Sequence, residues 1–265
     1  MTLLQSFLLG IIQGLTEFIP VSSTAHLLIA QEILRIPAND TMFSFLVIVQ
    51  LGTIISLIIF YWRDLLNLIQ AFFAKPFSTQ ENKLAWYIII ATIPALTAGF
   101  LLKDVVEALF KQPMLEASIR LFSAAILLTL AEYLTGKNRT LNSMTWLDAL
   151  VVGLFQIVAV FPGASRSGST IAGGMFRGFD RPAAARFAFL MSVPVLLAAG
   201  GYQTLDVIKM PDLGQFLPLL AVGFVTAAIV GWFAIKWLIE YLSKHSLYVF
   251  AGYCAIVGAI VFFLR

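Results

Sequence analysis

The chain has 265 residues, of which 60% are hydrophobic and 12% are charged, and its formal net charge is +3. A soluble domain is about 45–50% apolar and about 25% charged, so the composition excludes an ordinary soluble protein and predicts one surrounded by lipid. The basic residues stand in loops between apolar runs, the distribution typical of membrane proteins, and this excludes nucleic acid as a partner.

The first apolar region, residues 2–34, is interrupted by Pro20 and is expected to form two short helices. Around the break, residues 13–26 read Gln-Gly-Leu-Thr-Glu-Phe-Ile-Pro-Val-Ser-Ser-Thr-Ala-His, which places ionisable and hydroxyl groups in a membrane segment. Broken backbone is tolerated at membrane depth only where protein buries it or water reaches it. We therefore predict a re-entrant hairpin whose polar tip lines a cavity.

Six further apolar runs approach the roughly 20 residues that a helix needs to cross a bilayer. They span residues 43–61, 85–102, 117–134, 187–205, 217–238 and 247–264. None shows the period-two alternation of a barrel strand, so all six are predicted to be helices.

A second broken region, residues 146–179, lies between the third and fourth of these runs and contains Pro162 and Gly163. Its motif, residues 162–170, reads Pro-Gly-Ala-Ser-Arg-Ser-Gly-Ser-Thr. We predict a second re-entrant hairpin here.

The loops rich in lysine and arginine are expected in the cytoplasm, and they are residues 62–84, 135–145, 177–186 and 236–246. The loops expected outside are residues 103–116 and 206–216. These sides alternate correctly along the six runs. The two hairpins then enter from opposite faces, and their tips can meet near the midplane.

The halves 1–134 and 146–265 repeat one order, a broken hairpin followed by three spans, and an offset of 142 residues places Pro20 on Pro162 and Ser23 on Ser165. Inverted repeats with broken helices at their interface are a known membrane architecture. The predicted fold is therefore an all-α polytopic membrane protein. It forms one membrane domain, 1–265, with six transmembrane helices and two re-entrant helical hairpins in an inverted-topology repeat.

The second motif has the composition of a phosphate site. Glycines such as Gly163 let backbone N–H groups turn toward a ligand, and the helix N-terminus that follows favours negative charge. Arg166 can bind two phosphate oxygens as a fork. The alternative, a helix-packing site of small residues, does not explain Arg166.

The first motif carries reactive groups. Glu17 can hold a divalent metal or orient water, a hydroxyl can act as nucleophile or phosphate ligand, and His26 can move a proton. If Ser22 or Ser23 caps the second short helix, His26 lies in its first turn. Gln13 stands one turn before Glu17 and can face the same cavity. Gln50, in an apolar run, either reaches the cavity or makes an interhelical hydrogen bond.

The two motifs closely resemble the signatures of the undecaprenyl-diphosphatase family of bacterial membrane phosphatases, also known as bacitracin-resistance proteins. The first resembles (Glu/Gln)-x-x-x-Glu followed by Pro-x-Ser-Ser-x-x-His, and the second resembles Pro-Gly-x-Ser-Arg-Ser-Gly-x-Thr. The likeness covers nearly the whole chain, although Gln13 stands where many members have glutamate and Ala25 where glycine is usual.

This resemblance implies hydrolysis of undecaprenyl diphosphate to undecaprenyl phosphate and inorganic phosphate, which recycles the lipid carrier for cell-wall synthesis. It implies Mg or Ca as cofactor and a site opening to the outer side of the bacterial plasma membrane. By motif position, the catalytic residues would be Glu17, Ser23, His26 and Arg166. The phosphate-binding residues would include Thr24, Ser165, Ser167 and Thr170, to which the motif chemistry adds Ser22 and Gly163.

On this reading Arg166 and nearby N–H groups hold the phosphates, and the metal is held by Glu17 with help from Gln13. Ser23 attacks or positions the phosphorus, and His26 moves the proton. The expected partners are a polyprenyl diphosphate and membrane lipids, and a homodimer stays open.

The alternative class is a secondary transporter or flippase of an anionic lipid carrier, which broken helices and an anion site also suit. A protein with both activities is a third option. The Glu-Ser-His set favours hydrolysis, because transport of an anion needs no nucleophile. A purely structural membrane protein would not explain Arg166 and Glu17.

Overall fold

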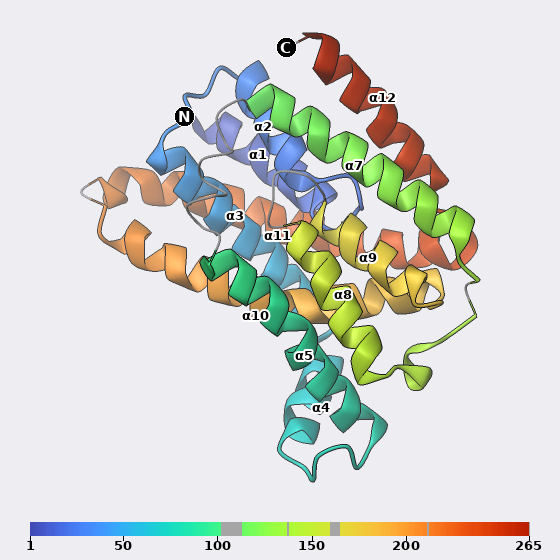
Figure 1. The fold of residues 1–265 in the computed structure, drawn as a ribbon. Helices are drawn as coiled ribbons and strands as arrows, with labels where there is room; N and C mark the ends of the chain where they lie inside the picture. The colour runs from blue at the N-terminus through green and yellow to red at the C-terminus, as the bar shows by residue number, and fades with distance from the viewer. Residues whose placement is uncertain (102–112, 137, 160–164, 211, 265) are drawn as a thin grey trace.

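The computed structural model describes residues 1–101, 113–136, 138–159, 165–210 and 212–264, and these residues are helical apart from their connections (Figure 1). The helices of the first half are α1 (Leu3–Thr16), α2 (Ser23–Ile33), α3 (Asp40–Phe60), α4 (Trp62–Phe72), α5 (Gln80–Leu101) and α7 (Pro113–Leu134). A short 3-10 turn, η1 (Leu141–Ser143), precedes α8 (Trp146–Val158), α9 (Arg166–Phe176), α10 (Arg181–Ile208), α11 (Leu213–Lys244) and α12 (Tyr248–Leu264). The prediction of an all-helical polytopic protein is confirmed.

The long helices coincide with the predicted spans. Among the described residues, α3, α5, α7, α10 and α11 are long and apolar enough to cross a membrane. The sixth predicted run is α12, whose 17 residues stand at the short end of the usual range of about 17–25. Residues 103–112 of the predicted outer loop 103–116 lie outside the described residues, and the side on which this loop lies stays a prediction.

Two predicted cytoplasmic loops are more helical than expected. Helix α4 occupies the start of loop 62–84, and α11 continues to Lys244 through most of loop 236–246. Both stretches keep apolar residues at helical spacing, and Leu68, Leu238 and Leu242 are buried. An amphipathic helix of this kind packs one face on the protein while the other meets solvent or headgroups.

Both broken regions form two short helices, as predicted, with α1 and α2 in the first and α8 and α9 in the second. Helix α1 has 14 residues and α8 has 13, so at about 1.5 Å per residue neither can cross a bilayer alone. Both begin with a capping box, Thr2 with Gln5 in α1 and Thr145 with Asp148 in α8. The second break, residues 160–164, lies outside the described residues, and with it Pro162 and Gly163.

Packing between the halves is reciprocal. Helix α1 packs on α11 and α8 on α5, while α3 meets α10, and α7 lies beside α12 along one edge of the molecule (Figure 1). Glycine makes the first two contacts close: a Cβ at Gly10 would lie 2.7 Å from the Gly223 carbonyl oxygen, and one at Gly153 would lie 2.5 Å from that of Ala91. Small residues permit this approach of backbones. The short first helix of each half thus packs on a helix of the other half, and the inverted-topology repeat stays a prediction.

The loops predicted on the cytoplasmic side meet at one end of the molecule. Arg186 of α10 pairs with Asp64 of α4 at 2.6 Å, and Arg181 pairs with Glu132 of α7 at 2.6 Å. Glu132 also accepts the backbone N–H of Leu247, at 2.9 Å. The pair of Arg186 with Asp64 joins loops 62–84 and 177–186, and Glu132 and Leu247 stand next to the other two loops, 135–145 and 236–246. The side of the membrane on which this end lies stays a prediction.

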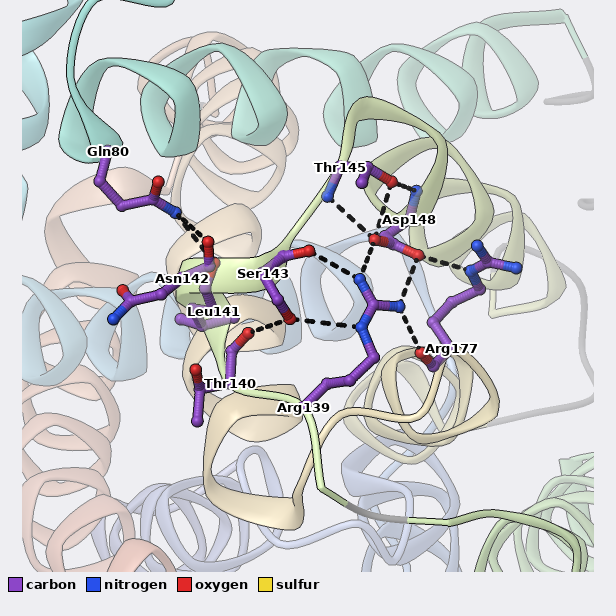
Figure 2. A network of polar contacts seen from close by, with 9 residues as sticks. All are labelled: Gln80, Arg139, Thr140, Leu141, Asn142, Ser143, Thr145, Asp148 and Arg177. Carbon is purple, nitrogen blue, oxygen red and sulfur yellow. Dashed lines mark hydrogen bonds and ion pairs between the residues drawn. The ribbon is translucent and has the colours of Figure 1, made fainter.

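The connection between the halves is fixed at this end by Asp148, in the first turn of α8 (Figure 2). Its side chain is fully buried and pairs with Arg139 at 2.7 Å and Arg177 at 2.6 Å. It also accepts from the N–H and the hydroxyl of Thr145. Burial opposes ionisation, but the hydrogen bonds from the two arginines and Thr145 outweigh it and hold the pKa of Asp148 well below its usual range.

Replacing Asp148 by asparagine is therefore expected to destabilise the fold by about 2–4 kcal/mol, because two arginines lose their anionic partner. The value lies below that of a fully dry ion pair because the arginine side chains are 33% and 34% exposed. Since the folded pKa is lowered, the stabilisation is fully present above the unfolded pKa of about 4, and it falls progressively as the pH drops below that value toward the folded pKa. Thermal unfolding of the purified protein between pH 3 and 8 measures both effects. A variant with unchanged stability at pH 7 would contradict this role.

Candidate active site

The tips of the two broken regions meet at a polar pocket with a volume of about 200 Å³. The first break contributes Glu17, Ser22, Ser23 and Thr24, and the start of α9 contributes Ser165, Arg166 and Ser167. The Ser167 hydroxyl also donates to the carbonyl of Ile19, at 3.4 Å, which joins one tip to the other. Two segments that contact each other through residues 148 positions apart thus form one site.

Glu17 is the centre of this pocket. It is 3% exposed, and its Oε2 accepts hydrogen bonds from Gln13 Nε2 and Ser23 Oγ, each at 2.7 Å. Its Oε1 accepts from Gln50 Nε2 at 3.1 Å and from Arg166 Nη2 at 2.5 Å. Four donors, one of them a guanidinium, compensate the cost of burying a carboxylate.

Arg166 lines the pocket and bonds Glu17 through one arm of its guanidinium, while the other arm has no partner among the described residues. Its side chain is 17% exposed, and its Nη1 is buried with no hydrogen-bond partner among the described residues. A guanidinium has five N–H donors, so Arg166 can pair with Glu17 and still bind an anion. A guanidinium at membrane depth with one arm unpartnered indicates a ligand site.

Two helices begin at the pocket. Ser22 caps α2 by accepting the N–H of Ala25, at 3.4 Å, and Ser165 caps α9 by accepting that of Gly168, at 3.2 Å. Ser22 has a φ of 69°, a left-handed conformation that is costly for serine and concentrates at functional sites. The N–H groups and dipoles of both helix starts favour an anion between them.

Not every predicted residue lines the pocket. The ring of His26 stacks on Tyr253 of α12, with centroids 5.6 Å apart. Its Nδ1 lies 2.8 Å from the Ser22 carbonyl and its Nε2 lies 2.7 Å from the Tyr253 hydroxyl. Thr170 lies one turn inside α9 and donates to the Arg166 carbonyl at 2.8 Å. Gly163 lies outside the described residues.

Gln13 and Gln50 both reach Glu17 as donors, and Gln50 also lines the pocket. The interhelical hydrogen bond and the cavity position, which the sequence left as alternatives for Gln50, therefore occur together. The donor set around Glu17 is one carboxylate, two side-chain amides and one hydroxyl. Among the described residues no group of three His, Cys, Asp or Glu side chains gathers as a metal site.

Two polar residues of the pocket were not singled out from the sequence, Gln156 of α8 and Arg120 of α7. Arg120 interrupts the apolar run 117–134 and could have been found by the rule that intramembrane charges mark function. Gln156 stands one position from the counterpart of Gln13 under the 142-residue offset, a signal too weak to use alone. The remaining lining is apolar and comes from Ala95, Ala159, Val195 and Leu196.

Comparison with known proteins gives one consistent result. The family described as bacitracin resistance protein BacA matches residues 6–260. The chain is similar to proteins named undecaprenyl-diphosphatase from Chloroherpeton thalassium, at 39% identity over 97% of this chain and 95% of that protein. It is also similar to those from Mycobacterium ulcerans, at 38% over 97% and 94%, and from Moorella thermoacetica, at 38% over the full length of both.

Proposed function

The chain belongs to the family of the bacitracin resistance protein BacA, and from this premise we propose that it is an integral membrane phosphatase. Its substrate is undecaprenyl diphosphate, and its products are undecaprenyl phosphate and inorganic phosphate. The single observation that carries the proposal is the buried Glu17, which is bonded at once to a hydroxyl, Ser23, and to a guanidinium with an unpartnered arm, Arg166. This set combines a nucleophile, a proton acceptor and a phosphate ligand.

Phosphate binding is assigned to Arg166 and to the two helix starts. The free arm of Arg166 binds the oxygens of the terminal phosphate, with the hydroxyls of Ser22, Thr24, Ser165 and Ser167 and the N–H groups of the helix starts as further donors. Donors fixed in advance stabilise the charge that develops in the transition state and need no rearrangement during reaction.

The reaction breaks the bond between the terminal phosphorus and the bridging oxygen. The attacking oxygen belongs either to Ser23, whose phosphoester water then hydrolyses, or to water positioned by Ser23; both routes end in the same products. Because the Ser23 hydroxyl donates to Glu17 at 2.7 Å, this carboxylate is its nearest proton acceptor. The leaving group is the prenyl monophosphate, whose bridging oxygen receives the electron pair.

We propose that a divalent cation binds at Glu17, for which the amides of Gln13 and Gln50 would have to turn, because their nitrogens now face the carboxylate. Mg²⁺ is bound in proteins by one or two carboxylates together with substrate phosphates and water, and Glu17, the amide oxygens of Gln13 and Gln50, and the Ser23 hydroxyl could hold it. When bound, the cation would neutralise charge on the diphosphate oxygens. We further propose that the pocket opens to the outer side of the plasma membrane, as the resemblance to the undecaprenyl-diphosphatase family implies.

The test is release of inorganic phosphate from undecaprenyl diphosphate by the purified protein with Mg²⁺ or Ca²⁺. We expect turnover that stops on chelation of the cation. A protein that releases no phosphate but moves the lipid carrier across a vesicle membrane would replace the phosphatase proposal with the transporter.

His26 could act in proton transfer, or it could only hold α2 against α12 through its contact with Tyr253. Replacement of His26 by alanine is expected to lower turnover about 10²-fold, the lower part of the usual range for proton transfer, because Glu17 already accepts from Ser23. For this transfer the ring must leave Tyr253 and turn toward the pocket. Tyr253→Phe removes only the hydroxyl bonded to Nε2 and is expected to change turnover less than tenfold. If both variants lose the same activity, His26 instead holds α2 against α12.

A further inference from the structure

The pocket has a second polar wall, which the proposed chemistry does not use. Gln156 of α8 is 2% exposed, and both its amide oxygen and its amide nitrogen are buried without a partner anywhere in the described part of the chain. Buried amides are nearly always hydrogen-bonded, and an exception needs an explanation. Because Gln156 lines the pocket, the explanation is a polar ligand.

Arg120 of α7 brings a second guanidinium to the same pocket. It is 5% exposed, and its Nε donates to Glu116, one turn earlier, at 2.8 Å. Glu116 is itself 5% exposed and does not line the pocket. The carboxylate therefore fixes the guanidinium from behind, in the helix, while the guanidinium lies against the cavity.

The charges facing the cavity favour an anion. Its lining contains one carboxylate, Glu17, and two guanidiniums, Arg166 and Arg120, in addition to two helix N-termini. Glu17 pairs with Arg166 and Glu116 pairs with Arg120, so each guanidinium is balanced by one carboxylate, and the two helix N-termini and the amide of Gln156 add neutral donors for an anion. A volume of about 200 Å³ has room for more than a single water-sized group.

A prenyl diphosphate carries two phosphates. Arg166 and the hydroxyls near it bind the terminal one, which leaves the phosphate attached to the prenyl chain without assigned ligands. We propose that Gln156 and Arg120 form a second phosphate subsite, which binds the phosphate attached to the prenyl chain. The inference rests on the proposed function, and it makes these two residues the determinants of specificity for a diphosphate over a monophosphate. The apolar lining residues Ala95, Val195 and Leu196 come from α5 and α10, and α5 packs on α8, the helix of Gln156. The prenyl chain leaves the pocket on that side.

The test compares inorganic phosphate with methylenediphosphonate, a diphosphate analogue that cannot be hydrolysed. Inhibition of prenyl diphosphate hydrolysis and thermal stabilisation of the purified protein are both measured. The wild-type protein is expected to prefer the diphosphonate by about tenfold or more, because hydrogen bonds to charged groups are worth that much. Gln156→Leu is expected to reduce this preference to about threefold or less, with phosphate affinity unchanged.

Arg120 is tested with its partner so that no buried carboxylate is left alone. The double variant Glu116→Gln/Arg120→Gln keeps a neutral hydrogen-bonded pair and removes the charge, and it is expected to lose the diphosphonate preference as Gln156→Leu does. Gln156→Glu, which adds a negative charge, is expected to weaken the diphosphonate further. Arg166→Lys serves as the contrast, because it should weaken phosphate and diphosphonate alike.

The inference is overturned if Gln156→Leu and the double variant keep the wild-type preference, or if they weaken both ligands equally. Failure of the proposed function is a separate outcome. In that case the wild-type protein hydrolyses no prenyl diphosphate, yet thermal stabilisation by the two ligands still decides whether the second subsite exists.

Discussion

Arg166→Ala is expected to lower hydrolysis of undecaprenyl diphosphate by at least about 10³-fold. Loss of one preorganised donor to a developing oxyanion costs about 10²–10³-fold, and Arg166 has an arm for the phosphate besides the one bonded to Glu17. Both the binding of phosphate and the stabilisation of the transition state are expected to suffer. Phosphate release by purified variants, with kcat and KM measured separately, checks the prediction.

The same substitution leaves Glu17 buried without its cation, which is expected to cost about 3–5 kcal/mol of stability. Activity and folding therefore need separate controls. Glu17→Gln/Arg166→Gln removes both charges and should restore much of the thermal stability without restoring turnover. Arg166→Lys keeps the charge but not the planar fork, so it should fold and remain strongly impaired. If the Arg166→Ala protein is folded and turns over at the wild-type rate, Arg166 has no role in the reaction.

Ser23→Ala is expected to lower turnover by at least about 10³-fold while it leaves substrate binding nearly unchanged. A nucleophile or a water-positioning hydroxyl acts on the chemical step, so its loss appears in kcat. The Ser23 hydroxyl donates to Glu17 at 2.7 Å, and its removal also leaves the carboxylate with one donor fewer. The measurement is kcat and KM for phosphate release, together with a search for a phosphoenzyme in the wild-type protein.

Ser56→Ala is the matched control for this change. Ser56 is a buried serine of α3 that donates to the carbonyl of Gly52 and does not line the pocket. Its substitution should leave turnover within about threefold of the wild type, because a hydroxyl that lies outside the pocket and bonds a carbonyl of its own helix takes no part in the reaction. Near-normal rates in Ser23→Ala would mean that another hydroxyl, or water held by other groups, makes the attack.

Residue patterns that are local in the chain predicted most of the helices. Pro20 marked the break between α1 and α2, and runs of about 20 apolar residues marked α3, α5, α7, α10 and α11. These features depend on a few neighbouring residues and on the thickness of a bilayer, so sequence suffices to find them. Sequence missed α4, because its 11 residues are too few for a span and lie among charged ones.

The sequence pointed to several polar residues of the pocket but not to their arrangement, and it did not single out Gln156 or Arg120. Chemistry at membrane depth pointed to Glu17 and Arg166, and the structure places them in direct contact. It does not follow from either motif that His26 rests on Tyr253, a residue 227 positions away. Nor could a motif indicate Gln156, because its position beside the pocket depends on tertiary packing.

The sequence by itself determined that the chain is a membrane protein and that two of its apolar regions are interrupted. It also showed that both interrupted regions carry side chains suited to binding phosphate. All three follow from the free energy of placing particular side chains in a membrane, which is a property of short segments. Only the tertiary structure decided which of those groups share a cavity. That choice is made by the packing of α1 on α11 and α8 on α5, where glycines let the helices approach closely enough for the two tips to touch.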